Sequence, residues 1–280
     1  MLRTSSVRVL DDRDRAEVTS ILAKDPVSNV FVASRVDVCG LDSWRLGAEM
    51  WGFPASGPLI ALCYAGANMV PVNAGEAAAR AFADRARRGS RRCSSLVGPA
   101  GQVAAMWAAL EPSWGPARDI RAHQPLMSIS SEPTAAGDPL VRAVRPDELD
   151  VVLPACVAMF TEEVGVSPVD IDGGALYRAR VAELIRMGRA FARIDDGRVV
   201  FKAEIGAATH SVCQIQGVWV APELRGRGLG TVGTAAVVSL ARARIAPVVS
   251  LNVNDYNAAA RRAYARIGMQ EIGELASILF

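Results

Sequence analysis

The alternation of apolar and polar positions divides the chain into two successive runs of strands and helices. The first run is predicted to contain a strand at 7–10, helices at 11–23 and 27–38, short strands at 48–53, 58–64 and 67–71, a helix at 74–88, a strand at 94–97, a helix at 103–110 and a strand within 117–129. The second is predicted to contain a strand at 141–144, helices at 146–159 and 174–187, strands at 190–194, 199–207 and 211–220, a helix up to 243, a strand at 248–253, a helix from 257 and a terminal strand region up to 280. The repeated order of elements indicates two α/β (α+β) domains.

The stretch between the two runs has the composition of a linker. Residues 130–139 are polar and contain Pro133, Gly137 and Pro139. A chain of 280 residues is long for one domain and suits two of ordinary size. We therefore predict a first domain over 1–129, a linker over 130–139 and a second domain over 140–280.

Composition narrows the class of protein. Residues 1–139 carry 15 basic and 14 acidic side chains and residues 140–280 carry 16 and 15, so neither half is expected to bind nucleic acid. The five cysteines are scattered and the two histidines have no companion at metal-ligand spacing, which predicts free thiols and no metal. No apolar signal core or membrane-length run is present, so we expect a cytoplasmic protein without membrane contact.

The most informative stretch runs from Val218 to Thr231. An apolar strand ends at Val220, a short loop follows, and the sequence Arg225-Gly226-Arg227-Gly228-Leu229-Gly230 leads into a helix. Glycines at a helix N-terminus let backbone N–H groups approach an anion, and flanking arginines add charge-assisted hydrogen bonds. The pattern lacks the Gly-Lys-Ser/Thr ending of a nucleotide-triphosphate loop and the Gly-x-Gly-x-x-Gly spacing of a dinucleotide fold.

A second pattern follows one helix and one strand later. Ser250–Asp255 reads as a strand and turn, and a helix begins with an N-cap at Asp255 or Asn257 and ends at Gly268. Within it, Asn257-Ala-Ala-Ala-Arg261-Arg-Ala-Tyr264 places an amide, a guanidinium and a phenol on one short helix.

Together the two patterns resemble the GNAT superfamily of N-acetyltransferases. Arg225, Gly228 and Gly230 match its Arg-x-x-Gly-x-Gly motif, and Asn257 to Met269 resembles its Asn-x-x-Ala-x-x-x-Tyr-x-x-x-Gly-Phe helix, with Met269 in place of Phe. The resemblance implies two GNAT-like domains, each a mixed, mostly antiparallel twisted sheet flanked by helices.

The resemblance also implies the coenzyme site. Acetyl-CoA, the acyl-donor cosubstrate, would bind along the strand residues Val218, Trp219 and Val220 and on the loop. The residues implied by the resemblance to bind it are Val218, Trp219, Val220, Arg225, Gly226, Arg227, Gly228, Leu229, Gly230, Thr231, Asn252, Asn257 and Arg261. The Val218 N–H would polarise the thioester carbonyl, and the Tyr264 hydroxyl would be the general acid for the leaving thiolate.

Deprotonating an ammonium group at neutral pH needs a carboxylate, directly or through a water. Glu204 on the strand 199–207 is the first candidate, with Lys202 on the same face; a charged pair on an outer face is the alternative. Glu163, beside Glu162, is the second candidate, since GNAT proteins usually carry a substrate-facing segment after the first helix. A pair of surface acids at a helix end is the alternative for these two.

The first half lacks this chemistry. The corresponding stretch 70–76 has one glycine and no arginine, and 101–110 has no tyrosine, so we interpret 1–129 as a degenerate repeat. Its five arginines at 85, 87, 88, 91 and 92 could bind an anion or form a solvated helix end.

The sequence thus predicts an N-acetyltransferase that moves an acetyl group to a primary amine, on a small molecule or a peptide, by direct attack in a ternary complex. Neither motif contains a cysteine to form an acyl-enzyme. A homodimer is compatible with this class.

The alternative to an enzyme is a non-catalytic acyl-CoA-binding sensor or scaffold. The tandem arrangement also resembles mycothiol synthase, although nothing in the sequence identifies a thiol-sugar substrate. RNA binding through Arg-Gly repeats is disfavoured by the neutral charge balance.

Overall fold

The computed structural model describes residues 6–170 and 173–280, which form two compact units. The first unit contains residues up to Leu126 together with Asn252–Asp255 and Ile272–Phe280. The second contains Met127–Leu251 and Tyr256–Glu271. By its contacts, the last strand of the chain therefore belongs to the unit that contains the first residues. The domain boundaries expected from the sequence, at 129/130 and 139/140, stay a prediction.

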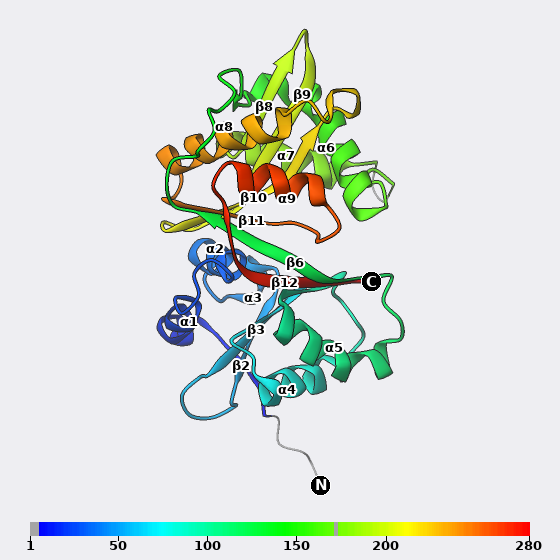
Figure 1. Ribbon diagram of the computed structural model, residues 1–280. Helices are drawn as coiled ribbons and strands as arrows, with labels where there is room; N and C mark the ends of the chain where they lie inside the picture. Colours follow the sequence, from blue (N-terminus) through cyan, green and yellow to red (C-terminus); the bar gives the residue numbers. More distant parts are fainter. Residues whose placement is uncertain (1–5, 171–172) are drawn as a thin grey trace. The chain divides into compact units, whose positions relative to one another are not determined.

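The first unit is a mixed sheet with helices on both faces (Figure 1). Its helical segments are a 3-10 turn at Asp12–Asp14, α1 (Arg15–Leu22), α2 (Val30–Cys39), α3 (Ser43–Leu46), α4 (Glu76–Ala86) and α5 (Ala100–Trp114). Its strands are β1 (Arg8–Val9), β2 (Glu49–Phe53), β3 (Ala61–Ala65), β4 (Asn68–Val72), β5 (Ser95–Pro99) and most of β12 (Gln270–Leu279), while β6 (Asp119–Ile129) runs from this unit into the second. Strands β1 to β4 pair antiparallel in sequence order, β4 pairs parallel with β5, and β5 pairs antiparallel with Leu275–Leu279 of β12.

Alternate side chains of these strands enter two separate cores. Trp51 and Cys63 pack with α4 and α5 on one face, whereas Met50 and Leu62 pack with α1 and α2 on the other. Successive side chains of a strand point to opposite faces, and here both faces are covered by helices. That is why these strands read as short continuous apolar runs rather than as alternating ones.

The second unit has the same succession of strand pairings. Its strands are β7 (Arg142–Ala143), β8 (Ala190–Asp195), β9 (Arg198–Ala208), β10 (Val212–Val220) and β11 (Val248–Asn252). Strands β7 to β10 pair antiparallel in order and β10 pairs parallel with β11. Its helical segments are 3-10 turns at Pro146–Glu148 and Pro222–Leu224, α6 (Leu149–Val164), α7 (Ala175–Arg186), α8 (Leu229–Arg244) and α9 (Ala258–Arg266).

Helices cover both faces of this sheet too. Residues of α6 and α7 such as Cys156 and Leu184 form one core with Ala192 of β8. Helix α8 lies on the other face, very close to β9: a Cβ added at Gly233 would come within 2.7 Å of the fully buried Phe201 ring. Small residues on α8 thus set its distance from the sheet, and through it the position of the loop that precedes the helix.

The predicted elements are largely confirmed. Both runs of strands and helices occur in the expected order, and the fold is a mixed α/β one with mostly antiparallel sheet flanked by helices. The helix expected at 103–110 is longer, spanning Ala100–Trp114, and the short α3 was not predicted. Asp42 caps α3 by accepting a hydrogen bond from the Arg45 N–H, and one such turn is too short to give a periodic signal.

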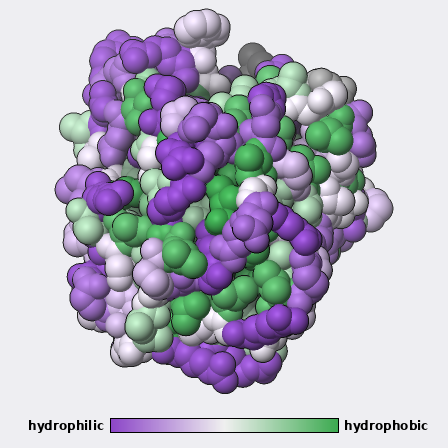
Figure 2. All heavy atoms as spheres, turned by 90° about the horizontal axis from the view of Figure 1, so that it is seen from above, coloured by the Kyte–Doolittle hydropathy of each residue, from purple (hydrophilic) through white to green (hydrophobic). Residues whose placement is uncertain are grey.

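The surface mixes residue types. Figure 2 shows hydrophobic residues among hydrophilic ones on one face of the molecule. Single large apolar side chains, such as Trp44 and Leu176, are exposed on the surface. Within the described ranges, no helix combines the length and the apolar character needed to cross a bilayer.

Candidate functional site

Strands β10 and β11 begin as neighbours and then part. Their parallel pairing runs from Val212↔Val248 to Gln214↔Ser250, and β10 then continues to Val220. On its other side β10 carries a bulge, because it advances three residues from Gln216 to Trp219 while β9 advances two, from Glu204 to Lys202. Gly217 lies in this bulge with φ +59°. The last residues of β10 therefore have backbone groups outside the ladder with β11.

The loop after β10 leads directly into α8. Arg225 is extended, Gly226 and Gly228 adopt φ of +76° and +87°, and Leu229 begins the helix. A Cβ at either of these two glycines would have open space around it, so the backbone conformation, not crowding, requires glycine there. The first N–H groups of α8 have no partner within the helix and carry its positive end. This geometry suits a phosphate or pyrophosphate group.

Arg225 is held by an acid from α6. Its Nη2 donates to Glu162 Oε2 at 2.7 Å and its Nε donates to the Val220 carbonyl at 3.0 Å. The Trp219 indole N–H donates to the other Glu162 oxygen at 3.2 Å. Both partners of the ion pair are 47 % exposed, and such pairs contribute about 0–1 kcal/mol, so an incoming anion can displace Glu162 at small cost.

Directly beneath the bulge lies a buried polar cluster. Lys202 and Glu204 form an ion pair on β9 although only 2 % and 5 % of their surfaces are exposed. The Cys156 thiol of α6 lies 3.6 Å from Lys202 Nζ and 3.5 Å from Glu204 Oε1. A Cβ at Gly217 would come within 3.2 Å of Lys202 Nζ and 2.8 Å of Met159 Cε. The bulge thus lies close against this cluster, and the φ of +59° at residue 217 favours glycine there.

Two groups next to this cluster have raised pKa values. Burial raises the pKa of the Cys156 thiol to about 11, with Lys202 opposing and Glu204 adding to the rise. Burial also raises the pKa of Tyr177, whose hydroxyl donates to the Cys156 carbonyl at 2.9 Å. Both groups are protonated at neutral pH, so Cys156 is not a thiolate nucleophile here.

Helix α9 presents the residues of the second pattern. The Asn257 side chain caps the helix by accepting a hydrogen bond from the Ala260 N–H, which confirms one of the two predicted caps. Tyr264 is buried, and burial raises its pKa well above the ordinary value, with the negative charge of Glu163 as the second cause. Arg261 lies 3.6 Å from Glu271. The phenol of Tyr264 is therefore protonated at neutral pH and close enough to Glu163 to be affected by its charge.

The structure corrects one interpretation and leaves others as predictions. Lys202 and Glu204 do share a face of β9, but the alternative of an exposed pair is wrong because both are buried. Arg225, Gly226, Arg227 and Gly228 are exposed on one loop, and Glu163 is exposed near the end of α6. Asn252 is the exposed last residue of β11 and is grouped with the first unit.

Two contacts of the site cannot be predicted from the sequence: that of Glu162 with Arg225, and that of Cys156 with the buried pair. Glu162 is expected from the sequence either to face the substrate beside Glu163 or to be a surface acid, and its link from α6 to Arg225 cannot be read from spacing. For the buried cluster a signal did exist: two opposite charges two residues apart in an otherwise apolar strand favour a buried pair over a solvated one. In the part of the chain that the structure describes, no three His, Cys, Asp or Glu side chains are grouped so as to hold a metal ion.

Comparison with protein families finds two matches. Residues 172–269 match the model of the acetyltransferase (GNAT) family, and residues 48–152 match a domain of unknown function, DUF4081. The comparison with curated proteins finds no match. The GNAT match contains β8 to β11, the loop before α8 and Tyr264.

Solved structures share the fold over nearly the whole chain. A GCN5-related N-acetyltransferase from Sphaerobacter thermophilus superposes with TM-score 0.60 and 16% identity, covering 98% of this chain and 95% of that one. A tandem GNAT protein from the clavulanic acid biosynthesis pathway gives 0.59 and 15%, with 98% of each chain covered. A GNAT-family acetyltransferase from Colwellia psychrerythraea gives 0.57 and 11%, covering 98% and 99%. The fold is thus that of GNAT proteins, and together with the family match it supports an acyltransferase.

The buried pair gives a stability prediction. Lys202→Met leaves the Glu204 carboxylate buried and unpaired, so we expect the free energy of unfolding to fall by about 3–5 kcal/mol. Lys202→Met with Glu204→Leu removes both charges and is expected to recover most of that loss. Urea denaturation of the two variants beside the wild type measures this; equal losses in both would show that the charges are not coupled.

Proposed function

We propose that this protein is an acetyl-CoA-dependent N-acetyltransferase that transfers an acetyl group to a primary amine by direct attack in a ternary complex, with its active site in the second unit. The observation that carries the proposal is the bulged end of β10, parted from β11, which leads into a loop with two left-handed glycines at the start of α8. This one segment has both an unpaired strand edge and a helix N-terminus that suits an anion. The match of 172–269 to the GNAT family supports the same assignment.

The coenzyme is proposed to bind along this backbone. Arg225 and Arg227 would hold the pyrophosphate with the N–H groups of Leu229, Gly230 and Thr231, since guanidinium groups and helix N-termini both favour phosphate. The edge formed by Val218, Trp219 and Val220 would take the pantetheine arm as an added strand. Asn257 and Arg261, on α9, and Asn252, on β11, would line the coenzyme. The Val218 N–H, within the bulge, would donate to the thioester oxygen as charge develops on it.

Proton transfer is proposed to use Tyr264 and Glu163. The Tyr264 phenol is protonated at neutral pH and would donate to the leaving sulfur. The Glu163 carboxylate would accept the proton of the attacking amine, directly or through a water. Glu204 is the weaker candidate because it is buried and paired with Lys202, and we propose instead that it positions the bulge.

The first unit is proposed to be a degenerate repeat of the same fold. Its strands pair in the same succession, and α4 occupies the place of α8 between two parallel strands. The connection before α4, however, is Asn73-Ala74-Gly75, which has no arginine to hold a pyrophosphate. We therefore assign coenzyme binding to the second unit alone.

The function is tested by release of free thiol from acetyl-CoA in the presence of amines. The panel contains polyamines, amino acids, aminoglycosides and peptides with free N-termini, with Arg225→Glu protein as the blank. Release above the blank with one class of amine is expected and would identify the acceptor. Tight acetyl-CoA binding without release by any amine would instead favour a non-catalytic acyl-CoA sensor or scaffold.

The ion pair between Arg225 and Glu162 predicts opposite effects of two substitutions on acetyl-CoA affinity. Arg225→Glu places a carboxylate against the pyrophosphate and is expected to raise Kd by about tenfold or more. Glu162→Gln frees Arg225 and is expected to lower Kd by up to about fivefold, because the exposed pair contributes at most about 1 kcal/mol.

Isothermal titration calorimetry with acetyl-CoA measures both affinities. Arg244→Glu is the matched control, since it makes the same charge change in the last turn of α8, about 20 Å from the loop. Equal effects of Arg225→Glu and Arg244→Glu would remove the loop from the coenzyme site.

Tyr264→Phe tests the proton donor. We expect kcat to fall by about 100-fold or more while the Kd for acetyl-CoA stays the same, because only the hydroxyl is lost and general acids contribute about this much. Steady-state kinetics on the best amine of the panel, with Tyr256→Phe as an exposed-tyrosine control, gives the comparison. An unchanged kcat would assign Tyr264 to packing.

A further inference from the structure

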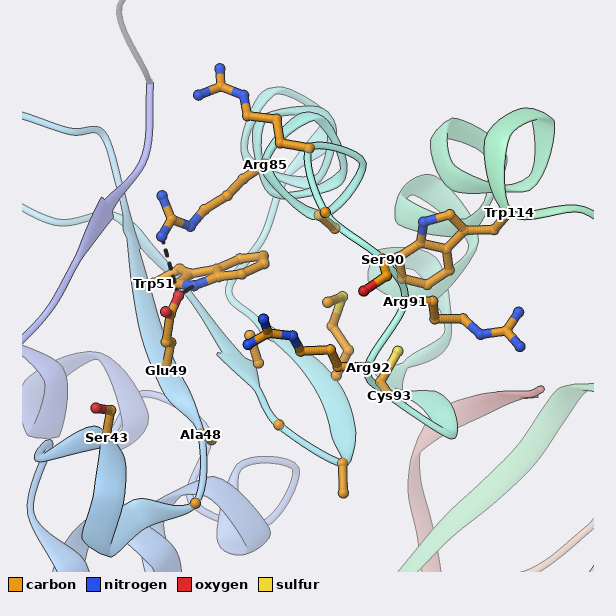
Figure 3. Close-up of a pocket in the computed structure, with 18 residues that line it drawn as sticks. Ser43, Ala48, Glu49, Trp51, Arg85, Ser90, Arg91, Arg92, Cys93 and Trp114 are labelled. Carbon is orange, nitrogen blue, oxygen red and sulfur yellow. Dashed lines mark hydrogen bonds and ion pairs between the residues drawn. The ribbon is translucent and has the colours of Figure 1, made fainter.

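The first unit contains a pocket that the proposed reaction does not use. Its volume is about 740 Å³, within the range of small-molecule sites. It is formed by the start of β2, the β3–β4 hairpin, the segment after α4 and the end of α5 (Figure 3). These segments come from separate parts of the sequence, so no motif reveals the pocket.

The pocket concentrates positive charge. Arg85, Arg88, Arg91 and Arg92 line it together with one acid, Glu49, an excess of three positive charges in a chain whose total is +2. Within the described residues, no acid lies within ion-pair distance of Arg88, Arg91 or Arg92. Arg85 is paired with Glu49, and the remaining positive charges at the pocket repel one another, so a bound anion would relieve that repulsion.

Arg85 and Glu49 form a fixed part of the wall. Arg85 Nη2 donates to Glu49 Oε2 at 3.1 Å and its guanidinium lies 4.9 Å from the centre of the Trp51 ring. The Trp51 N–H donates to the same oxygen at 2.6 Å and, with Arg85, keeps the pKa of Glu49 below its ordinary value. Arg85 Nε is buried and, like Arg8 Nε elsewhere in this unit, has no hydrogen-bond partner among the residues described, an arrangement that costs free energy.

Arg91 and Arg92 are not explained as a helix end, whereas Arg88 lies just after the end of α4. The negative end of a helix acts on charges within its last turn, and α4 ends at Ala86. Arg91 and Arg92 come five and six residues later, in irregular backbone. Arg92 points toward Glu49 and Trp51 in Figure 3, whereas Arg91 points away from them and lies over the Phe280 ring at 4.5 Å. Arg87, which pairs with Asp84, does not line the pocket.

The pocket is also distinct from the position that corresponds to the coenzyme loop. In the first unit that position precedes α4, at Gly75, whereas the pocket follows the other end of the helix. Eleven helical residues separate the two, or about 16 Å.

The rest of the lining determines what else a ligand must carry. Trp51, Met69, Cys93 and Trp114 give the pocket an apolar wall of which two members are indole rings. Guanidinium groups bind phosphate and carboxylate groups in a bidentate manner, and aromatic walls favour flat apolar groups. We propose that the first unit binds a small organic anion with a flat body and a phosphate or carboxylate group, and that Arg88 and Arg92 contact its charged end.

Calorimetric titration of the full chain tests this at constant ionic strength. The probes are ADP and phthalate, which combine a flat body with phosphate or carboxylate, and pyrophosphate and adenosine, which each lack one part. We expect ADP or phthalate to bind more tightly than pyrophosphate and adenosine; whichever binds identifies the charged group. Failure of both at about 10 mM would overturn the proposal, and so would binding of pyrophosphate as tight as that of ADP.

Three variants locate the binding. Arg88→Gln with Arg92→Gln is expected to weaken it by about tenfold or more, because charge-assisted hydrogen bonds are lost. Arg87→Gln, a neighbour outside the pocket, is expected to leave it unchanged. Arg225→Glu, in the proposed coenzyme loop, is expected to leave phthalate binding unchanged and to remove only such ADP binding as occurs at that loop. Loss in Arg87→Gln equal to that in the double variant would overturn the proposal, and loss confined to Arg225→Glu would assign the ligand to the second unit. Unchanged melting temperatures show that the variants are folded.

Discussion

The central constraint on the second unit is that the charges of Lys202 and Glu204 are buried together on β9. Moving two charges out of water costs several kcal/mol for each, and only close mutual contact offsets that cost. The two side chains therefore stay in contact on β9 at the point where β10 bulges, and Gly217, whose φ is +59°, lies against them. The ladder between β10 and β11 has already ended at Gln214 and Ser250, so the end of β10 leads into the loop and α8 without a partner on that side.

The groups of the loop near this buried pair are held weakly. The pair of Arg225 with Glu162 is half-exposed, and the loop glycines have open space around them. A rigid interior with exchangeable charges at its rim is well suited to binding a charged cosubstrate and releasing it again, because pre-organised backbone costs little to order while surface pairs are readily exchanged.

Much of the fold could be predicted from the sequence, and the reasons for the failures are specific. Apolar periodicity gave the elements because both faces of each sheet are covered, and the Asn257 cap followed from residue type. Periodicity places Lys202 and Glu204 on one face but does not say whether that face is buried. The bulge at Gly217 depends on a backbone angle. The pocket that contains Arg85, Arg88, Arg91 and Arg92 also includes Trp51 and Trp114, which come from distant segments of the sequence. The pairing of β5 with the end of β12 is also not encoded in any local pattern.

That last pairing has a consequence for synthesis of the protein. Ile272–Phe280 completes the sheet of the first unit beside β5, yet the ribosome must first make the whole of the second unit. At ordinary elongation rates this takes on the order of ten seconds, during which β5 has an unpaired edge. Unpaired strand edges are templates for association with other chains. The nascent first unit is thus a natural client for chaperones, and the moment at which β12 leaves the ribosome sets the earliest time at which its sheet can close.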